Sequence, residues 1–286
     1  MQLNPFTLHT PKTIKEALGL YTSLEDVKLL AGGTFLINNL KMLKRKGIKT
    51  PQNVISLKDV KELVGIDASD EVNIKAMTLL GDLSYSELIT DNLSVLKEAC
   101  GLIGTNQIRN MATIGGNLTC RYTWTELGTV LIALDGMLHF VNKEGGEEAL
   151  SAEEFFKGAA KTHDILTHIT IKKNSACTAN YQRVNKTQGL DIPMLAICIS
   201  TIFQNKTFTN TRVAINSGNA FAQRDYKLEE FLNGKKHNNS LGEDAINHID
   251  TDIYDKRGDD YKKHMFRVSI KKAISSYGQR LKKSSQ

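Results

Sequence analysis

The pattern of apolar and polar positions changes period several times along this chain. Apolar or alternating runs predict strands, whereas apolar residues three or four apart predict helices. The strand-like runs are residues 4–8, 27–31, 53–57, 64–66, 72–76, 137–141, 165–171, 179–184, 195–203 and 211–216. The helix-like segments are residues 13–21, 34–44, 93–102, 124–134, 227–232, 242–249 and 259–277.

Short local patterns mark where some of these elements begin or turn. Residues 13–16, 84–87 and 151–154 each have the Ser/Thr-x-x-Glu form of a capping box, so we expect a helix to begin at each. Gly145-Gly146 follows the strand at 137–141 and predicts a hairpin turn.

The order of these elements predicts an α+β protein. A chain of 286 residues is expected to divide into two or three lobes. The first lobe reads as a small α/β unit, and strands followed by helices in the last part predict an α+β lobe. We place the domains at residues 1–57, 58–174 and 175–286, with the second boundary in the polar stretch Lys172-Lys173-Asn174-Ser175.

The composition is that of an ordinary globular protein, with 41% hydrophobic and 24% charged residues. No apolar run approaches the roughly 20 residues that span a bilayer. The N-terminus has no basic segment followed by an apolar one, as a secretory signal would. These features predict a cytoplasmic protein without a membrane span.

Several kinds of chemistry have no support in the sequence. The four cysteines form no C-x-x-C pair, so we expect neither a metal nor an iron–sulfur cluster in this chain. The net charge is +6, but the C-terminal lysine pairs lie at helical spacing and read as a solvated face, so we expect no nucleic-acid partner. No set of residues suggests a catalytic triad, and we assign no catalytic residue.

Two glycine pairs carry the functional signal. Gly32-Gly33 lies between an apolar strand and an amphipathic helix, a geometry that holds phosphates. Gly115-Gly116 lies about eighty residues later, in a stretch with little strand or helix character. Glycine permits positive φ, and adjacent N–H groups in such a bend can converge on an anion. Neither pair matches a dinucleotide or Walker fingerprint, so the loops alone indicate a phosphate-bearing cofactor of unspecified kind.

The combination of both loops resembles a known family. AGGT after an apolar strand, then IGTNQIRNMATIGGN, then an apolar helix ending LIALD, resembles the FAD-binding subunit of molybdenum hydroxylases such as xanthine dehydrogenase. The resemblance implies a PCMH/VAO-type FAD-binding domain of two α/β subdomains. It also implies a C-terminal α+β domain, an antiparallel sheet with helices, like that of the carbon monoxide dehydrogenase flavoprotein.

The resemblance implies FAD as the cofactor and assigns residues to it. The first loop would lie against the pyrophosphate and ribityl chain through Leu30, Ala31, Gly32, Gly33, Thr34, Phe35 and Leu36. Many relatives carry an acidic residue where Phe35 stands here. In the second loop Ala112, Thr113, Gly116 and Asn117 would contact the pyrophosphate and adenosine side, Ile103, Gly104 and Ile108 would line the neighbouring wall, and Thr119 and Cys120 would follow on a strand.

Further along, Glu126 could accept hydrogen bonds from a ribose hydroxyl or simply be a carboxylate at a helix N-terminus. Arg183 takes the position of a cation near the flavin's pyrimidine edge, and Leu166 would pack on the ring system. Arg109 would tie its loop down. Residues 188–192 fall where relatives carry a turn.

The resemblance also implies partners: a [2Fe–2S] subunit and a molybdopterin-containing large subunit of the same complex. The chain would be an FAD-dependent oxidoreductase subunit acting on CH or CH–NH groups, passing electrons from iron–sulfur clusters to FAD and on to NAD⁺ or another acceptor. Two alternatives remain open. One is a free-standing flavin reductase on the same fold. The other is a flavin-free assembly subunit, suggested by Phe35 and the irregular Arg121-Tyr122-Thr123-Trp124 segment.

Overall fold

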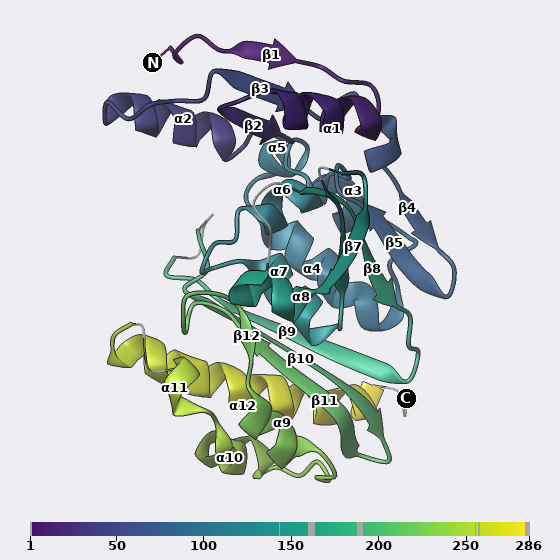
Figure 1. Cartoon of the computed structure of the whole chain (residues 1–286). Coiled ribbons are helices and arrows are strands. Elements are labelled where there is room, and N and C mark those ends of the chain that lie inside the picture. Colours follow the sequence, from purple (N-terminus) through teal and green to yellow (C-terminus); the bar gives the residue numbers. More distant parts are fainter. Residues whose placement is uncertain are drawn as a thin grey trace.

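A computed structural model describes residues 2–142, 144–159, 164–187, 191–254, 256 and 258–283. The chain forms three sheets that follow one another along the sequence (Figure 1). Figure 1 shows the N-terminal sheet at one end, the second sheet with its helices in the middle, and the third sheet with the C-terminal helices at the other end.

The first sheet is parallel and has three short strands. They are β1 (Thr7–His9), β2 (Val27–Leu30) and β3 (Asn53–Ser56), in the order β1-β3-β2. Parallel strands need crossover connections, which helices α1 (Ile14–Ser23) and α2 (Leu36–Arg45) supply. The expected cap of α1 is present, since Thr13 Oγ1 accepts a hydrogen bond from the Glu16 N–H at 3.1 Å.

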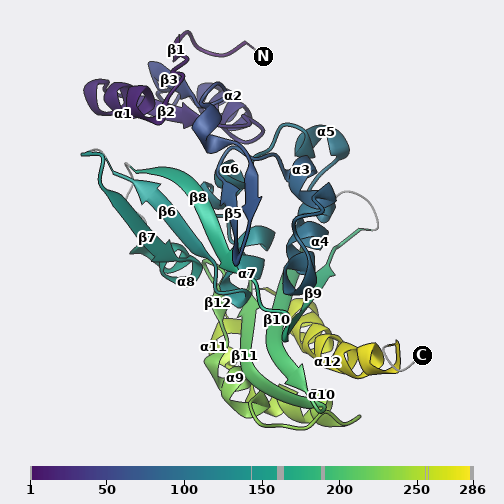
Figure 2. The same ribbon diagram turned by 90° about the vertical axis from the view of Figure 1, so that its right-hand side faces the viewer.

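The second sheet is antiparallel and has five strands. They are β4 (Ile66–Ala68), β5 (Glu71–Lys75), β6 (Met137–Val141), β7 (Glu147–Ser151) and β8 (Ile165–Lys172), in the order β4-β5-β8-β6-β7. Its inner face shares one core with the helices beside it (Figure 2). The helical segments of this region are η1 (Lys61–Leu63), α3 (Leu80–Tyr85), η2 (Asp91–Leu93), α4 (Ser94–Leu102), α5 (Asn106–Arg109), α6 (Ile114–Thr119), α7 (Glu126–Ala133), α8 (Ala152–Glu154) and η3 (Phe155–Ala159).

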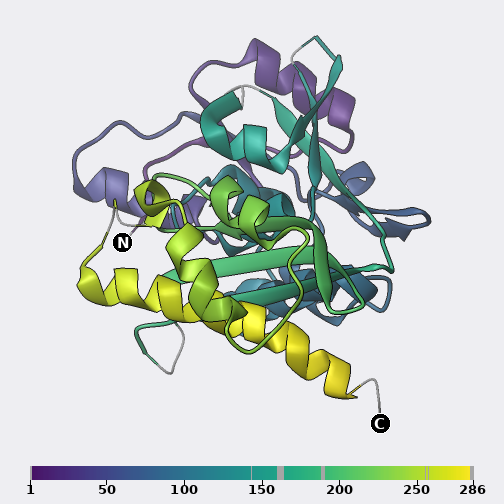
Figure 3. The same ribbon diagram turned by 90° about the horizontal axis from the view of Figure 1, so that it is seen from below.

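The third sheet lies between two layers of helices. Its strands are β9 (Cys177–Val184), β10 (Leu195–Gln204), β11 (Thr207–Ile215) and β12 (Gln223–Arg224), antiparallel in the order β12-β11-β10-β9. One face packs on α4 and α7, and the other is covered by helices that include the long α12 (Figure 3). The C-terminal helices are α9 (Tyr226–Leu232), α10 (Leu241–Ala245), η4 (Ile246–His248), α11 (Thr251–Tyr254) and α12 (Asp260–Lys283).

The sequence of β10 explains why this strand can be buried on both faces. Successive side chains of a strand point to opposite faces. The small side chains Ala196 and Cys198 join the core of the second sheet, whereas Leu195, Ile197 and Ile199 join the core under the C-terminal helices. A continuous apolar run is the expected pattern for such a strand.

Most predicted elements are present and the α+β class is confirmed, but some local predictions are wrong. Ser84 does not begin a helix, because it lies near the end of α3, where the buried side chains of Leu80 and Leu83 set the helical face. The stretch 103–117 is not without helix, since it contains α5 and the start of α6. Thr119 and Cys120 end a helix and do not lie on a strand. Strand β12 and helix α11 were not predicted.

The expected domain boundaries, 57/58 and 174/175, fall between β3 and β4 and between β8 and β9, where the chain passes from one sheet to the next. The division into three domains stays a prediction. Residues 188–190 of the expected turn lie outside the described residues. Among the helices of the described ranges, none has the length and apolar character needed to cross a bilayer.

Candidate cofactor-binding site

A cleft of about 710 Å³ opens where the first glycine loop meets α6 and the second sheet. Its walls come from segments far apart in the sequence: the loop between β2 and α2, the first turns of α6, the segment 120–124, and the start of β8. In Figure 1 α6 lies just below the first sheet, so the cleft forms at the junction of two layers.

The two glycine segments touch each other at this cleft. A Cβ built on Gly32 would lie 1.9 Å from the carbonyl oxygen of Met111, and one built on Gly116 would lie 3.3 Å from Ala31 Cβ. Any side chain at Gly32 would therefore push the two segments apart. The glycines bring two backbone segments together, so that one ligand can touch both.

The first loop presents free hydrogen-bond donors. Gly33 adopts φ +71°, and α2 begins at Leu36 without a side-chain cap on its N-terminus. Within the described chain, no acceptor is bonded to the backbone N–H groups of residues 32–35. Unpaired N–H groups at the start of a helix bind anions, because they donate hydrogen bonds and the helix dipole adds positive potential.

The second glycine segment works differently from what the sequence suggests. Gly115 N–H donates to Ala76 O at 2.8 Å, and Gly116 N–H donates to Thr113 Oγ1 at 3.1 Å. Neither glycine has a positive φ, because both lie in the first turn of α6. The expectation of a bend with convergent N–H groups is therefore wrong here. The segment instead offers a close, side-chain-free approach and the Asn117 Oδ1 atom, which is buried without a partner in the described chain.

Many predicted site residues line the cleft, and others lie outside its lining. Those in the lining are Ala31, Gly32, Gly33, Thr34, Phe35, Leu36, Ala112, Thr113, Gly116, Asn117, Thr119, Cys120 and Leu166. Those outside it are Leu30, Ile103, Gly104, Ile108, Glu126 and Arg183.

The loop from Ile103 to Ile108 is held by Arg109, whose guanidinium Nη1 donates to Ile103 O at 3.0 Å and to Gly104 O at 2.8 Å. Leu30 is the last residue of β2, and its side chain packs against Gly33. The hydrogen bonds of Arg109 hold its own loop, which is the structural role that the sequence suggested for this residue.

Glu126 and Arg183 form a buried joint away from the cleft lining. Arg183 Nε lies 3.0 Å from Glu126 Oε1, and the Tyr181 hydroxyl donates to the same oxygen at 2.6 Å. The other Arg183 nitrogens donate to Leu102 O and Asp191 O. Burial raises the pKa of Glu126, and the hydrogen bond from Tyr181 and the charge of Arg183 offset part of that rise. Of the two readings of Glu126, the geometry favours a structural carboxylate at a helix start.

The sequence-based reading missed an aromatic and cationic wall. Arg121, Tyr122 and Trp124 line the cleft, as do Phe140 and Phe155. The Tyr122 and Trp124 rings are stacked with centroids 4.3 Å apart, and Phe35 meets Tyr122 edge-on at 4.9 Å. Part of the signal was present in the sequence, because Tyr122 and Trp124 come soon after Gly115-Gly116, but nothing local shows that their side chains turn into the cleft.

Cys120 lies in the lining but is not a reactive thiol. Burial raises the pKa of Cys120 to about 11, so its thiol stays protonated at neutral pH. Its side chain is a small apolar part of the wall.

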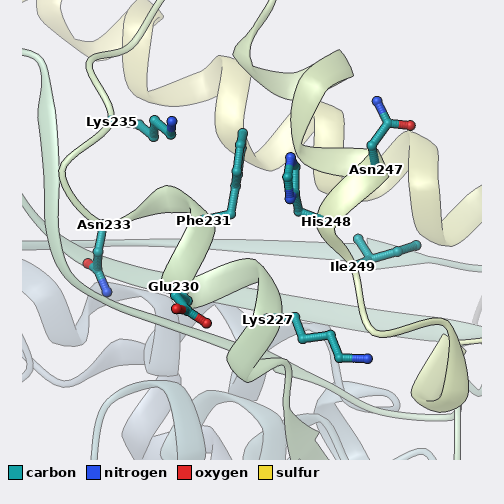
Figure 4. Close-up of a pocket in the computed structure, with 8 residues that line it drawn as sticks. All are labelled: Lys227, Glu230, Phe231, Asn233, Lys235, Asn247, His248 and Ile249. Carbon is teal, nitrogen blue, oxygen red and sulfur yellow. The ribbon is translucent and has the colours of Figure 1, made fainter.

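A second hollow, of about 700 Å³, lies among the C-terminal helices (Figure 4). The Phe231 and His248 rings that line it are stacked on each other at 3.9 Å, and Lys227 pairs with Asp250. None of the buried unpartnered polar atoms identified in the described chain belongs to its lining residues. The first cleft therefore has the stronger features of a ligand site.

Comparison with known proteins agrees with this geometry. Residues 4–172 match the family of the FAD binding domain in molybdopterin dehydrogenase. This chain belongs to that family. The cofactor expected in the cleft is therefore FAD, and the lining residues can be compared with the chemical groups of FAD.

Two relatives extend the similarity beyond this segment. The carbon monoxide dehydrogenase medium chain of Hydrogenophaga pseudoflava is 29% identical over 283 residues, which cover 95% of this chain and 96% of that protein. The 6-hydroxypseudooxynicotine dehydrogenase complex subunit alpha of Paenarthrobacter nicotinovorans is 34% identical over 214 residues, covering 73% of this chain and 71% of that protein. A solved structure of the Hydrogenophaga pseudoflava carbon monoxide dehydrogenase matches with a TM-score of 0.85 and 25% identity, covering 96% of this chain and 98% of that one. The C-terminal α+β part therefore also has its counterpart in that structure.

The cleft fits FAD on its own features. The free N–H groups of residues 32–35 match the acceptor oxygens of a diphosphate, and Asn117 Oδ1 needs a donor such as a sugar hydroxyl. The aromatic and aliphatic wall suits the faces of flat rings.

Proposed function

We propose that this chain is the FAD-binding subunit of a multi-subunit molybdenum hydroxylase. In this proposal a [2Fe–2S] subunit delivers electrons to FAD, a large subunit holds the molybdopterin site that oxidises a CH or CH–NH group, and electrons leave FAD to NAD⁺ or another acceptor. The observation that carries the proposal is the contact of the two glycine segments at one cleft, in a chain that matches medium subunits over nearly its whole length.

In this proposal the residues of the chain bind and orient, and FAD supplies the electron transfer when it is bound. The N–H groups of Gly32, Gly33, Thr34 and Phe35 donate to the diphosphate, and the Thr34 hydroxyl adds a donor. Asn117 accepts from a hydroxyl of the sugar chain. Leu166, with Phe140 and Phe155 near it in the wall, packs against the ring system and keeps water from it.

FAD uptake can be followed with a reporter that the chain provides. Trp124 is the single tryptophan of the sequence and lies in the cleft lining. Oxidised flavin absorbs where indole emits, so we expect titration of the apoprotein with FAD to quench Trp124 emission strongly and to saturate at one FAD per chain. The Trp124→Phe variant should bind FAD, seen as bound flavin absorbance, without this emission change.

The subunit role is tested by native purification. The chain should co-purify with an iron–sulfur subunit and a molybdopterin subunit, and the complex should contain one FAD for each copy of this chain. A native complex without flavin would overturn the proposal in favour of an assembly subunit. Turnover of a soluble substrate by the isolated flavin-loaded chain would favour a free-standing reductase.

A further inference from the structure

We propose that Arg121, rather than Arg183, is the cation that faces the flavin ring and balances the negative charge that reduction places on it. The inference rests on the proposed function. It assigns a positioning and tuning role to a residue in the segment 121–124, to which the resemblance gives no role.

Arg121 is held at the cleft by aromatic faces and not by carboxylates. Its guanidinium lies over the Phe155 ring at 5.2 Å and over the Phe221 ring at 4.9 Å, and Nη2 donates to Phe156 O at 3.3 Å. Its Nε is buried and has no partner in the described chain. Buried N–H donors in proteins normally have a hydrogen-bond partner. Because this donor has none within the described chain, it can donate a hydrogen bond to a ligand.

The charge of Arg121 is also unbalanced. No ion pair joins it to an acidic side chain of the described residues. Burial alone lowers the pKa of Arg121, which still leaves a guanidinium charged at neutral pH. A half-buried cation without a counter-ion beside a cleft attracts a negative charge more strongly than one in water, because the local dielectric constant is lower.

The backbone at Arg121 supports a specific role as well. Arg121 has φ +47°, in the left-handed region that residues with a side chain rarely adopt. Such conformations cost energy and persist where the surroundings hold them in place. Here that conformation accompanies a side chain held between two ring faces.

Arg183 Nε also has no hydrogen-bond partner in the described chain, but the charge of Arg183 is balanced and the residue lies outside the cleft lining. Its Nε pairs with Glu126, its other nitrogens donate to two backbone carbonyls, and it does not line the cleft. A cation already neutralised by a buried carboxylate adds little net potential at a distance.

The position of Arg121 in the wall points to the ring end of the cofactor. Phe155, under the guanidinium, packs on Phe140 at 5.6 Å, and Phe140 pairs in register with Leu166 on β8. All of these residues line the cleft, and Leu166 is the residue expected to pack on the ring system. Two-electron reduction of a flavin with uptake of one proton leaves one negative charge on the ring, so a cation at this end favours the reduced form.

The test is the midpoint potential of bound FAD in the full complex, measured by equilibrium titration with a reducing dye couple. Arg121→Gln should make the potential more negative by about 30 mV or more, which for a two-electron couple is about a tenfold change in the reduction equilibrium. Arg121→Lys, which keeps the charge, should restore most of the shift. Arg183→Gln should change the potential much less.

The affinity of the oxidised and reduced forms separates the competing outcomes. We expect Arg121→Gln to weaken the binding of reduced FAD more than the binding of oxidised FAD. If the binding of both forms weakened equally and the potential did not change, Arg121 would lie at the diphosphate and the inference would be overturned. A larger potential shift in Arg183→Gln than in Arg121→Gln would also overturn it. If the wild-type complex bound no FAD, the proposed function itself would fail, which is a distinguishable result.

Discussion

Gly32 and Gly33 are adjacent in the sequence but serve different physical needs. Gly32 has an ordinary backbone conformation and is needed because Met111 O occupies the space of a Cβ. A Cβ built on Gly33 would meet only the side chains of Leu30 and Ile37, at 3.3 and 3.4 Å, but the φ of +71° at Gly33 is left-handed. The sequence assigns both glycines to one turn. Only the three-dimensional structure shows that Gly32 is required by a close contact and Gly33 by its backbone conformation.

The φ of Gly33 leads to a prediction at the scale of one residue. Gly33→Ala should strain the loop by about 1–2 kcal/mol, because a left-handed conformation is unfavourable for a residue with a Cβ. If the loop shifts to relieve that strain, its N–H groups leave their present positions at the cleft, so FAD affinity should fall by about tenfold or more. The measurement is the Kd from Trp124 quenching together with the melting temperature.

Gly145 provides a matched control for this experiment. It has φ +82° with open space around it, in the hairpin between β6 and β7, and it does not line the cleft. Gly145→Ala should lower stability by a similar amount and leave FAD affinity unchanged. Unchanged FAD affinity in Gly33→Ala would refute the role of the first loop.

At the scale of elements, the outer face of the second sheet carries a stacked histidine pair. His139 on β6 and His168 on β8 have ring centroids 4.2 Å apart and nearly parallel planes. His139 Nε2 is hydrogen-bonded to the Thr170 hydroxyl, and His168 Nδ1 is hydrogen-bonded to the Thr167 hydroxyl. Burial, His139 and Lys75 lower the pKa of His168 from its ordinary 6.5 to about 4. Burial also lowers the pKa of His139, partly opposed by Glu71 and Glu147.

This pair predicts a pH dependence of stability. A histidine whose pKa is lower in the folded state stabilises the fold fully above pH 6.5, and that contribution is lost as the pH falls toward about 4. The free energy of unfolding should therefore fall over this range, and the His168→Gln variant should lose less of it than the wild type. Urea unfolding at several pH values measures this. His264→Gln, which alters an exposed residue of α12, should follow the wild-type slope; identical slopes for all three proteins would contradict the prediction.

At the scale of the whole molecule, two ion pairs join the region around α7 to the third sheet. Glu126 with Arg183 is buried, with side chains 5% and 11% exposed. Asp135 with Arg212 is largely exposed on the aspartate side, at 60%. Both pairs link the same two layers, and they differ strongly in burial.

This difference predicts unequal costs when each pair is broken. Glu126→Gln should destabilise the protein by about 3 kcal/mol, at the low end for breaking a buried pair because Gln still accepts from the Tyr181 hydroxyl. Asp135→Asn should cost less than about 1 kcal/mol, since exposed pairs contribute little and Asn tolerates the φ of +59° at this position. Urea unfolding at pH 7 of both variants measures this, and equal costs would show that the buried joint has no special role.

How much could be predicted depended on the range of the interactions involved. The caps at Thr13 and Ser151 were predicted because the donor and acceptor are three residues apart. The capping pattern at residues 84–87 failed because packing of Leu80 and Leu83 placed the helix earlier, a long-range effect that the local pattern does not contain. The segment 103–117 was predicted as a loop because its two helices are short and are stabilised by contacts with other segments.

The sequence by itself determined the α+β class, the order of most strands and helices, and the place of the two glycine segments, because these features arise from local patterning. The choice of FAD as the cofactor came from the resemblance of these segments to a known family. Only the tertiary structure decided that Gly115 and Gly116 open a helix, that Arg183 is paired with Glu126, and that Arg121 and Trp124 turn into the cleft. The physical reason is that a side chain's role depends on its partners, and these partners come from segments far apart in the chain.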